Sequence, residues 1–226
     1  MATVLITGAN RGIGLEFARQ YGADGHTVIA TCRNPLGVGA LSTIQGDIQV
    51  HGLEVTDQAQ LARLAVDLKD TPIDILINNA GVYGPRSYDP MEIDTREWHH
   101  VFQINVMSPL QVSLAFVDNI VAAHGKIATL SSKMGSMTDN TSGGSYIYRS
   151  SKAAVNAVMK SLANDLMDRS IPVCVLHPGW VQTDMGGENA LIPVETSVSG
   201  LRQVIDDLSM SSTGTFFNYD GQNIRW

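Results

Sequence analysis

Two side chains suited to proton transfer, Tyr148 and Lys152, lie four positions apart in Tyr148-Arg-Ser-Ser-Lys152. At the start of a predicted helix, this spacing places both on one face, about a turn apart. A phenol with a pKa near 10 is a poor acid–base group at neutral pH. An ammonium about 4–5 Å away favours the phenolate by roughly 4 kcal/mol, enough to bring the tyrosine pKa down to about 7. The pair predicts proton exchange with a substrate oxygen, although the same spacing also occurs in surface pairs.

A glycine-rich loop lies near the start of the chain, with the sequence Thr7-Gly8-Ala9-Asn10-Arg11-Gly12-Ile13-Gly14. Its spacing, G-x-x-x-G-x-G, differs from the dinucleotide fingerprint G-x-G-x-x-G. The physical reason for the glycines is shared, because they let the backbone approach a pyrophosphate, whose charge favours the free amides of a helix N-terminus. The loop therefore predicts a nucleotide cofactor. The alternative is a glycine-rich turn without a ligand.

The choice of cofactor depends on the end of the second predicted strand, Thr31-Cys32-Arg33-Asn34. Many NAD-binding folds place an acidic residue there to hold the ribose diol. This chain has no acid at that point, whereas Arg33 can pair with a 2′-phosphate and Arg11 can approach the same group from the glycine loop. We therefore predict NADP(H) as the cofactor rather than NAD(H). The alternative is that both arginines are ordinary solvated charges.

Short apolar runs alternate with helical patterns along the whole chain. The predicted strands cover residues 4–7, 26–32, 50–55, 73–77, 126–131, 171–177 and 214–217. The predicted helices cover 13–23, a segment capped by Thr56 or Asp57 and ending at Lys69, 95–123 with a bend at Pro109, 148–168, and 193–208. The connection 32–48 is expected to hold one poor helix or none.

This alternation predicts the α/β class. We expect a single-domain Rossmann-type fold over residues 1–226, a doubly wound parallel sheet of about seven strands with helices on both faces.

Composition excludes several classes of protein. The chain has 226 residues, 44% of them hydrophobic, which argues against disorder. Its net charge of −7 argues against nucleic acid or an anionic membrane as partner. No apolar run is long enough to span a bilayer, the first residues lack the features of a signal peptide, and Cys32 and Cys174 fit buried thiols in a reducing compartment. We expect a soluble cytoplasmic protein. No metal-ligand pattern and no G-x-S-x-G nucleophile motif is found.

Taken in order, the motifs resemble those of the short-chain dehydrogenase/reductase family. The matching segments extend over nearly the whole chain and are 7–14, Asn78-Asn79-Ala80-Gly81, Asn105, Ser131-Ser132, 148–152 and 178–183. Segments 142–144, 178–187 and 221–226 are most similar to a subgroup that holds the sniffer-type carbonyl reductases and the C-factor developmental signal proteins.

The resemblance implies roles for four residues. Tyr148 is the acid–base residue, Lys152 binds the nicotinamide ribose and lowers the tyrosine pKa, Ser132 bonds the substrate carbonyl, and Asn105 holds a water that links Lys152 to solvent. Ser131 is the weaker candidate for the serine, because neighbouring strand residues point to opposite faces. The interval between Ser132 and Tyr148 is longer than usual in the family, and the stretch 142–144 can absorb the difference as a loop insertion.

The residues expected to bind the cofactor come from the glycine loop, the ends of the predicted strands and the loop after Pro178. Residues 79–81 are expected to line the adenosine side of the cleft and residues 178–183 the nicotinamide end. Glu54 stands where the family usually has an aspartate near the adenine. The full set is Gly8, Asn10, Arg11, Gly12, Ile13, Gly14, Arg33, Glu54, Val55, Asn79, Ala80, Gly81, Tyr148, Lys152, Pro178, Gly179, Val181 and Thr183.

The predicted function is NADPH-dependent reduction of a small aldehyde, ketone or quinone to an alcohol, with Tyr148 as general acid. The alternative is an NAD(P)-binding signalling or sensing protein of the C-factor type with little turnover. Few residues separate Met185 from Pro193, which favours a short lid and an open cleft. The helix that begins at Tyr148 is apolar on more than one face, and the family often uses this helix between subunits, so a homodimer is predicted.

Overall fold

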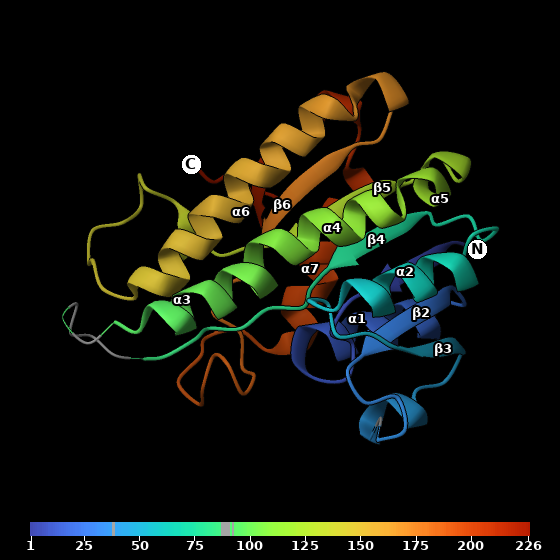
Figure 1. Cartoon of the computed structure of the whole chain (residues 1–226), viewed down its shortest axis with the longest axis horizontal. Helices are drawn as coiled ribbons and strands as arrows, with labels where there is room; N and C mark the ends of the chain where they lie inside the picture. The colour runs from blue at the N-terminus through green and yellow to red at the C-terminus, as the bar shows by residue number, and fades with distance from the viewer. Residues whose placement is uncertain (38, 87–90, 92) are drawn as a thin grey trace.

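Seven parallel strands form one sheet in the order β3-β2-β1-β4-β5-β6-β7 (Figure 1). The computed structural model describes residues 1–37, 39–86, 91 and 93–226. The strands are β1 (Thr3–Ile6), β2 (Thr27–Cys32), β3 (Asp47–Gly52), β4 (Ile75–Asn78), β5 (Lys126–Leu130), β6 (Val173–His177) and β7 (Thr215–Asn218). The strand order reverses between β1 and β4, and a ligand cleft in such a sheet opens at that point, beyond the carboxyl ends of the strands.

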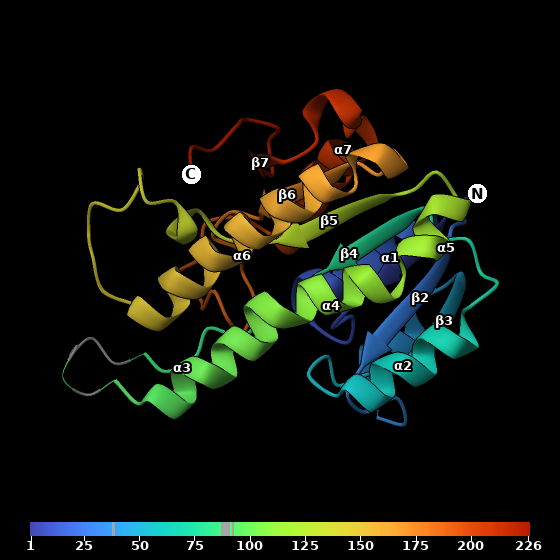
Figure 2. The ribbon, with the colours of Figure 1, turned by 45° about the horizontal axis from the view of Figure 1, so that its top comes forward.

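Helices cover both faces of the sheet, as the alternating pattern predicts (Figures 1 and 2). They are α1 (Gly12–Ala23), α2 (Gln58–Asp67), α3 (Thr95–Phe102), α4 (Ser108–Ala115), α5 (Val117–Ala122), α6 (Tyr146–Asp165) and α7 (Val194–Asp207). Helices α1 and α7 pack on one face, and α2, α4 and α6 pack on the other. The predicted doubly wound fold is therefore confirmed. In the part of the chain that the structure describes, no helix has both the length and the apolar character to cross a membrane.

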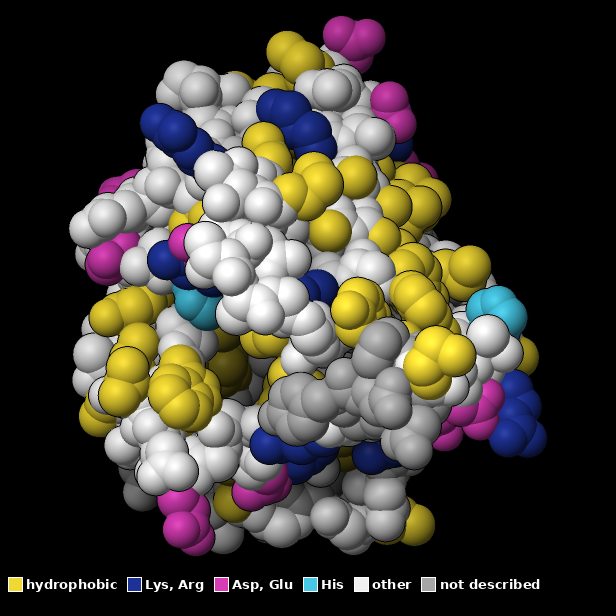
Figure 3. Space-filling view, turned by 90° about the vertical axis from the view of Figure 1, so that its left-hand side faces the viewer, with side chains coloured by type: hydrophobic (Ala, Val, Ile, Leu, Met, Phe, Trp, Pro, Cys, Tyr) yellow, Lys and Arg dark blue, Asp and Glu magenta, His cyan; other side chains and the backbone are white. Residues whose placement is uncertain are grey.

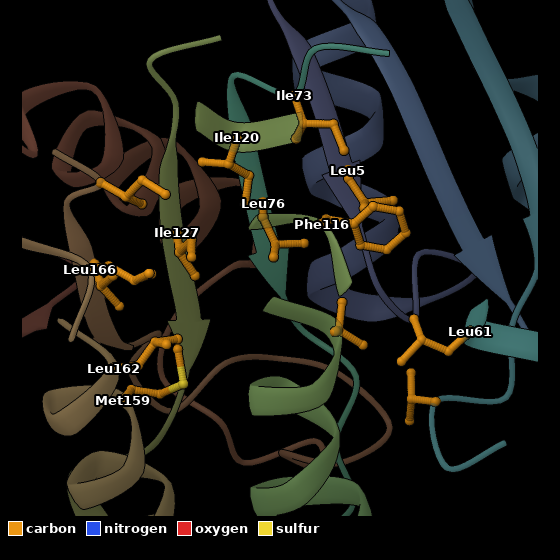
Figure 4. Packing of buried hydrophobic residues seen from close by; sticks show 14 of the residues in the cluster. Leu5, Leu61, Ile73, Leu76, Phe116, Ile120, Ile127, Met159, Leu162 and Leu166 are labelled. Carbon is orange, nitrogen blue, oxygen red and sulfur yellow. The ribbon is translucent and has the colours of Figure 1, made fainter. Parts of the chain in front are cut away.

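Side chains along each strand point alternately to opposite faces of the sheet, and this divides the core into two layers. In β1, Val4 and Ile6 pack under α1 and α7, whereas Leu5 faces the opposite cluster. Figure 4 shows part of that second cluster, where Leu5 and Leu76 lie close to Phe116. Because α4 and α6 are fixed on the sheet by such contacts, the polar ends of the strands are held in constant positions relative to both helices.

The third strand differs from its prediction. It covers Asp47–Gly52 and not residues 50–55, pairing with β2 from Thr27↔Asp47 onward. As an edge strand it alternates exposed and half-buried residues and has no apolar run. The prediction relied on the apolar residues Leu53 and Val55, which are buried but lie beyond the end of the strand. In its described residues, the connection before this strand holds one short 3-10 helix, Gly39–Thr43.

The single helix predicted over 95–123 is divided. Helix α3 leads into a π-helical turn, Gln103–Met107, before α4 and α5 continue. Pro109 lies in the first turn of α4, and its missing N–H cannot bond the carbonyl of Asn105. The Ser108 backbone N–H and the Ser108 hydroxyl both donate to the Gln103 carbonyl instead. The irregularity therefore falls in the turn before the proline and places Asn105 at a widened point of the helix.

Smaller differences concern helix ends. Asp57 is the cap of α2, because its carboxylate accepts from the backbone N–H groups of Ala59 and Gln60. This helix ends at Asp67, before Lys69. Helix α6 begins two residues before the predicted Tyr148 and ends at Asp165, followed by a 3-10 turn, Met167–Arg169.

Candidate active site

One cleft opens at the carboxyl edge of the sheet, where the glycine loop, the ends of β2, β4, β5 and β6, and the start of α6 meet. Figure 3 shows the hollowed side of the molecule at this edge. Most of the predicted cofactor residues line the cleft: Gly8, Asn10, Arg11, Gly12, Ile13, Arg33, Glu54, Val55, Asn79, Ala80, Gly81, Tyr148, Lys152, Pro178 and Thr183.

Three predicted cofactor residues lie elsewhere. Gly14 is packed beneath the glycine loop, and Val181 is buried in the core after β6. Gly179 lines a second cavity together with Trp180, His177 and the last residues of the chain. The sequence places these positions in the correct loops but does not show which side of each loop faces the cleft.

The glycine loop forms a tight cradle. Gly8 and Gly12 adopt positive φ angles of 67° and 53°. A Cβ at Gly14 would stand 2.4 Å from the Gly8 carbonyl oxygen and 2.5 Å from Asn79 Nδ2, so only glycine fits there. The side chain of Arg11, the N-cap residue of α1, makes no capping hydrogen bond. The first amides of α1 therefore face the cleft as donors for an anion, and the residues present fit a nucleotide pyrophosphate.

Asn79 joins the ends of β1 and β4. Its Nδ2 donates to the carbonyl oxygens of Thr7 (2.8 Å) and Gly8 (3.0 Å). In return, Thr7 Oγ1 accepts from the backbone N–H groups of Asn79 (3.0 Å) and Ala80 (3.1 Å). These four hydrogen bonds fix the glycine loop against the β4 loop, so Asn79 both lines the cleft and holds its two walls together.

Tyr148 and Lys152 lie together at the inner end of the cleft, with relative exposures of 9% and 6%. Lys152 Nζ donates to the Leu130 carbonyl at the end of β5 (2.9 Å) and lies 5.8 Å from the centre of the Tyr148 ring. Helical spacing puts both residues on the face of α6 that meets β5, as their separation predicts.

Burial sets the pKa of both groups. It lowers the pKa of Lys152 to about 8 and raises the pKa of Tyr148 to about 12. A hydrogen bond with Ser132 opposes the rise in the pKa of Tyr148, and the nearby Tyr83 adds to it. The pKa of Tyr148 therefore lies above its ordinary value of 10, and not below it as the Tyr148–Lys152 spacing alone predicts, because burial of the phenol is the largest influence. The separate effect of Lys152 on this pKa stays a prediction.

The two serines after β5 point in opposite directions. Ser132 lies near enough to the Tyr148 phenol to lower its pKa, and the Ser132 hydroxyl accepts from the Met134 N–H (3.1 Å). Ser131 points into the core, where its hydroxyl donates to Asn156 Oδ1 (2.6 Å). The residues that line the cleft include Ser131 and not Ser132, so the role of Ser132 in bonding a substrate carbonyl stays a prediction.

Asn105 holds the loop after β4. Its side chain accepts from the Val82 N–H (2.9 Å) and donates to the Val82 carbonyl (2.8 Å) and to Ser151 Oγ (3.0 Å). A Cβ at Gly81 would lie 3.3 Å from Asn105 Oδ1 and 3.7 Å from Lys152 Nζ, which places Gly81 between these two side chains. The Asn105 amide therefore fixes the backbone of Val82 beside Lys152, and its predicted water link to Lys152 stays a prediction.

The two arginines predicted to hold a phosphate stand at the mouth of the cleft. Arg11 forms an exposed ion pair across it with Asp184 (3.0 Å). Arg33 is exposed and, within the described part of the chain, forms no ion pair or side-chain hydrogen bond. Glu54 lines the cleft, and its carboxylate accepts from Thr56 Oγ1 (3.1 Å).

Sequence reasoning missed two residues of the segment after β4. The Tyr83 ring stacks on Tyr148 with ring centres 4.4 Å apart and an interplanar angle of 21°. The Arg86 guanidinium lies 5.2 Å from the centre of the Tyr83 ring and donates to the Met185 carbonyl (2.8 Å). The only signal in the sequence is an aromatic residue two positions after Gly81, and nothing there indicates that this segment lies against α6.

Comparisons with known proteins agree on one family. The family model for short chain dehydrogenases matches residues 2–191. The chain is 42% identical over 156 residues to the C-signal protein of Myxococcus xanthus, covering 69% of this chain and 93% of that protein.

Two solved structures superpose on nearly the whole fold. The carbonyl reductase Sniffer of D. melanogaster has a TM-score of 0.93 and 32% identity, with 100% of each chain covered. The NADPH-bound carbonyl reductase from chicken fatty liver has a TM-score of 0.92 and 32% identity, covering 100% of this chain and 99% of that one.

The first prediction concerns the ammonium of Lys152. In protein labelled with ¹³C at lysine Cε, the Lys152 resonance, assigned by its loss in Lys152→Met, should titrate near pH 8 because burial disfavours the charged form. The unfolded chain keeps this proton up to about pH 10.5, so the contribution of Lys152 to stability should rise with pH between these two values. A midpoint at 10.5 would show that the ammonium is solvated and contradict the described burial.

Proposed function

The chain belongs to the short chain dehydrogenase family of oxidoreductases, and from this we propose that it uses NADPH to reduce a carbonyl group to an alcohol. The observation that carries the proposal is the buried phenol of Tyr148, with Ser132 near it, in a cleft that a glycine cradle also lines. Structural likeness to two carbonyl reductases supports the same class of reaction. The substrate class is a small aldehyde, ketone or quinone.

The residues that would hold the cofactor are those of the cradle and the cleft wall. The pyrophosphate fits the uncapped start of α1, with Pro178 and Thr183 near the nicotinamide and Lys152 near its ribose. When bound, the reduced nicotinamide would supply a hydride to the carbonyl carbon. Arg11 and Arg33 at the mouth of the cleft offer guanidinium groups to a 2′-phosphate, which supports NADPH over NADH.

The proton is supplied by Tyr148. Because its pKa is near 12, the phenol is fully protonated at neutral pH and acts as an acid. The Ser132 hydroxyl lies beside it and can donate a second hydrogen bond to the same carbonyl oxygen, which stabilises the negative charge that develops there. At pH 7 Lys152 is charged in most molecules, because its pKa is near 8. This cation favours the phenolate that forms when Tyr148 gives up its proton. The protonation states at neutral pH therefore suit reduction better than alcohol oxidation.

A second candidate function is signalling or cofactor sensing. The relationship to the Myxococcus xanthus C-signal protein favours it. In that case the cleft would bind NADP(H), and the biological output would be an interaction with another molecule. Absorbance at the nicotinamide wavelength separates the two functions: tight NADPH binding without NADPH consumption, against a panel of aldehydes, quinones and diketones, would favour sensing.

Removing the phenol hydroxyl should abolish turnover and spare binding. In Tyr148→Phe, we expect kcat to fall by about 10²–10⁴-fold, because the general acid is lost, while the NADPH dissociation constant stays near the wild-type value. Tyr146→Phe is the matched control, since Tyr146 is exposed at the start of the same helix. Retained turnover in Tyr148→Phe would reject the role of this residue.

Cofactor preference should depend on Arg33. We expect Arg33→Ala to weaken NADPH binding by about tenfold or more, the loss of one charge-assisted contact, and to leave NADH binding unchanged. Arg63→Ala, which removes an exposed arginine from α2, should change neither constant. If calorimetry shows that wild-type protein binds NADH as tightly as NADPH, the assignment of Arg33 is wrong.

We propose that the chain forms a homodimer through α4 and α6. These helices lie side by side on one face (Figure 2), and exposed or half-buried apolar residues, Leu114, Val158 and Ala157, lie on them. Light scattering at micromolar concentration should give about twice the chain mass of 24.3 kDa, and Leu114→Glu should lower it to one chain. A wild-type mass near 24.3 kDa would contradict this assembly.

A further inference from the structure

The backbone on both sides of Tyr83 is fixed. Before it, the Asn105 side chain bonds both the N–H and the carbonyl of Val82. After it, Gly84 has a φ of 79°, and a Cβ there would lie 2.8 Å from Val101 on α3, so the segment is pressed against that helix. Tyr83 therefore projects from a short stretch that cannot readily move, and its stacked contact with Tyr148 is set by the fold.

The Tyr83 hydroxyl reaches Ser145, the residue just before α6. It lies 2.9 Å from Ser145 Oγ, and either oxygen can donate. Serine at the N-cap usually accepts from a backbone N–H of its own helix. Ser145 does not, because its backbone is left-handed, with a φ of 48°, and its hydroxyl is directed to Tyr83 instead. A non-glycine residue in this conformation is strained, and such strain persists where neighbours hold it.

The stack also connects to the opposite wall of the cleft. The Arg86 guanidinium contacts the Tyr83 ring and donates to the Met185 carbonyl, in the loop after β6. Met185 lines the cleft with Tyr148. Tyr83 is therefore in contact with the start of α6, the Tyr148 ring and, through Arg86, the β6 loop, although it does not itself line the cleft.

We propose that Tyr83 is a positioning residue for Tyr148: its ring fixes the plane of the Tyr148 ring and so the direction of the phenol hydroxyl, and its hydroxyl holds Ser145 at the start of α6. The inference rests on the proposed function, because it assigns Tyr148 as the proton donor. Proton transfer depends on the placement of the donor within a fraction of an ångström. A stacked ring gives that placement with an interaction typical of aromatic pairs.

Three groups lie around the Tyr148 phenol in the described structure, and a fourth lies behind one of them. Lys152 lies on its own helix, Ser132 at the end of β5, and Tyr83 in the loop after β4, with Arg86 behind Tyr83. The Tyr83 ring covers the Tyr148 ring from water, and a charge interaction with Tyr83 also raises the pKa of Tyr148. Removing the Tyr83 ring should therefore alter the titration of Tyr148 as well as its placement.

Two variants separate the effect of the Tyr83 ring from the effect of the Tyr83 hydroxyl. In Tyr83→Leu, which removes the stack, we expect kcat for carbonyl reduction to fall by about tenfold, with the NADPH dissociation constant near wild type. In Tyr83→Phe, the stack remains and only the bond to Ser145 is lost, so kcat should stay within about threefold of wild type. Tyr146→Leu, the same substitution at an exposed site on α6, is the control and should leave kcat unchanged.

A second readout needs no turnover. In protein labelled with ¹³C at tyrosine Cζ, the Tyr148 resonance, assigned by its loss in Tyr148→Phe, should titrate at lower pH in Tyr83→Leu than in wild type, moving from about 12 toward the ordinary value of 10. In Tyr83→Phe the midpoint should move less, since the ring still covers the phenol. A role in stability alone would lower the melting temperature without moving this midpoint.

The outcomes are distinct. The proposal is overturned if Tyr83→Leu keeps both the kcat and the Tyr148 titration midpoint of the wild type. It is also overturned if Tyr83→Leu and Tyr83→Phe lose the same amount of kcat. If the wild-type protein reduces no carbonyl at all, the proposed function fails, and the Tyr148 midpoint alone decides whether Tyr83 controls this phenol. If Tyr83→Leu does not fold, Tyr83→Met removes the ring with a flexible apolar chain and carries the same expectations.

Discussion

Burial of the Lys152 ammonium against the Leu130 carbonyl is the interaction on which the site depends. A charged amine out of water is unfavourable unless partners satisfy it, and here the partner is the last carbonyl of β5. That contact requires α6 to lie at a fixed height over the sheet. Val155, Met159 and Leu162 bring this about by packing α6 into the core. Strongly perturbed groups in a cleft are typical of functional sites, and this pair is perturbed in both members.

The same constraint explains why the cleft lies where it does. The strand order reverses between β1 and β4, and the two loops that leave these strands diverge to leave a crevice. Asn79 and Thr7 hold the crevice open by tying the first residues of both loops together. On the far side, Ser132 and Tyr148 meet because β5 ends where α6 begins to cross it. The glycine cradle and Tyr148 therefore both lie in the one crevice that the reversal of strand order creates.

Much of this arrangement could be predicted from the sequence, because the decisive patterns are local. Tyr148 and Lys152 share a helix face by spacing alone, and the glycine loop follows a short apolar run that suggests a buried strand. What depends on tertiary contacts could not be predicted. The direction of the Tyr148 pKa depends on burial, which spacing does not report. The bounds of β3 depend on pairing with β2, and the stacking of Tyr83 depends on how the β4 loop packs against α3 and α6.

The most direct test of hydride transfer in this cleft uses NADPH that carries deuterium at both C4 positions of the nicotinamide and follows where the deuterium goes. If the cleft is a redox site, mass spectrometry of the alcohol should find one deuterium on the former carbonyl carbon for each NADPH consumed. The hydroxyl proton should come from water through Tyr148 and carry no label. A protein that binds the labelled nucleotide at the cleft but leaves all of the deuterium on it, with every carbonyl offered, would contradict the account.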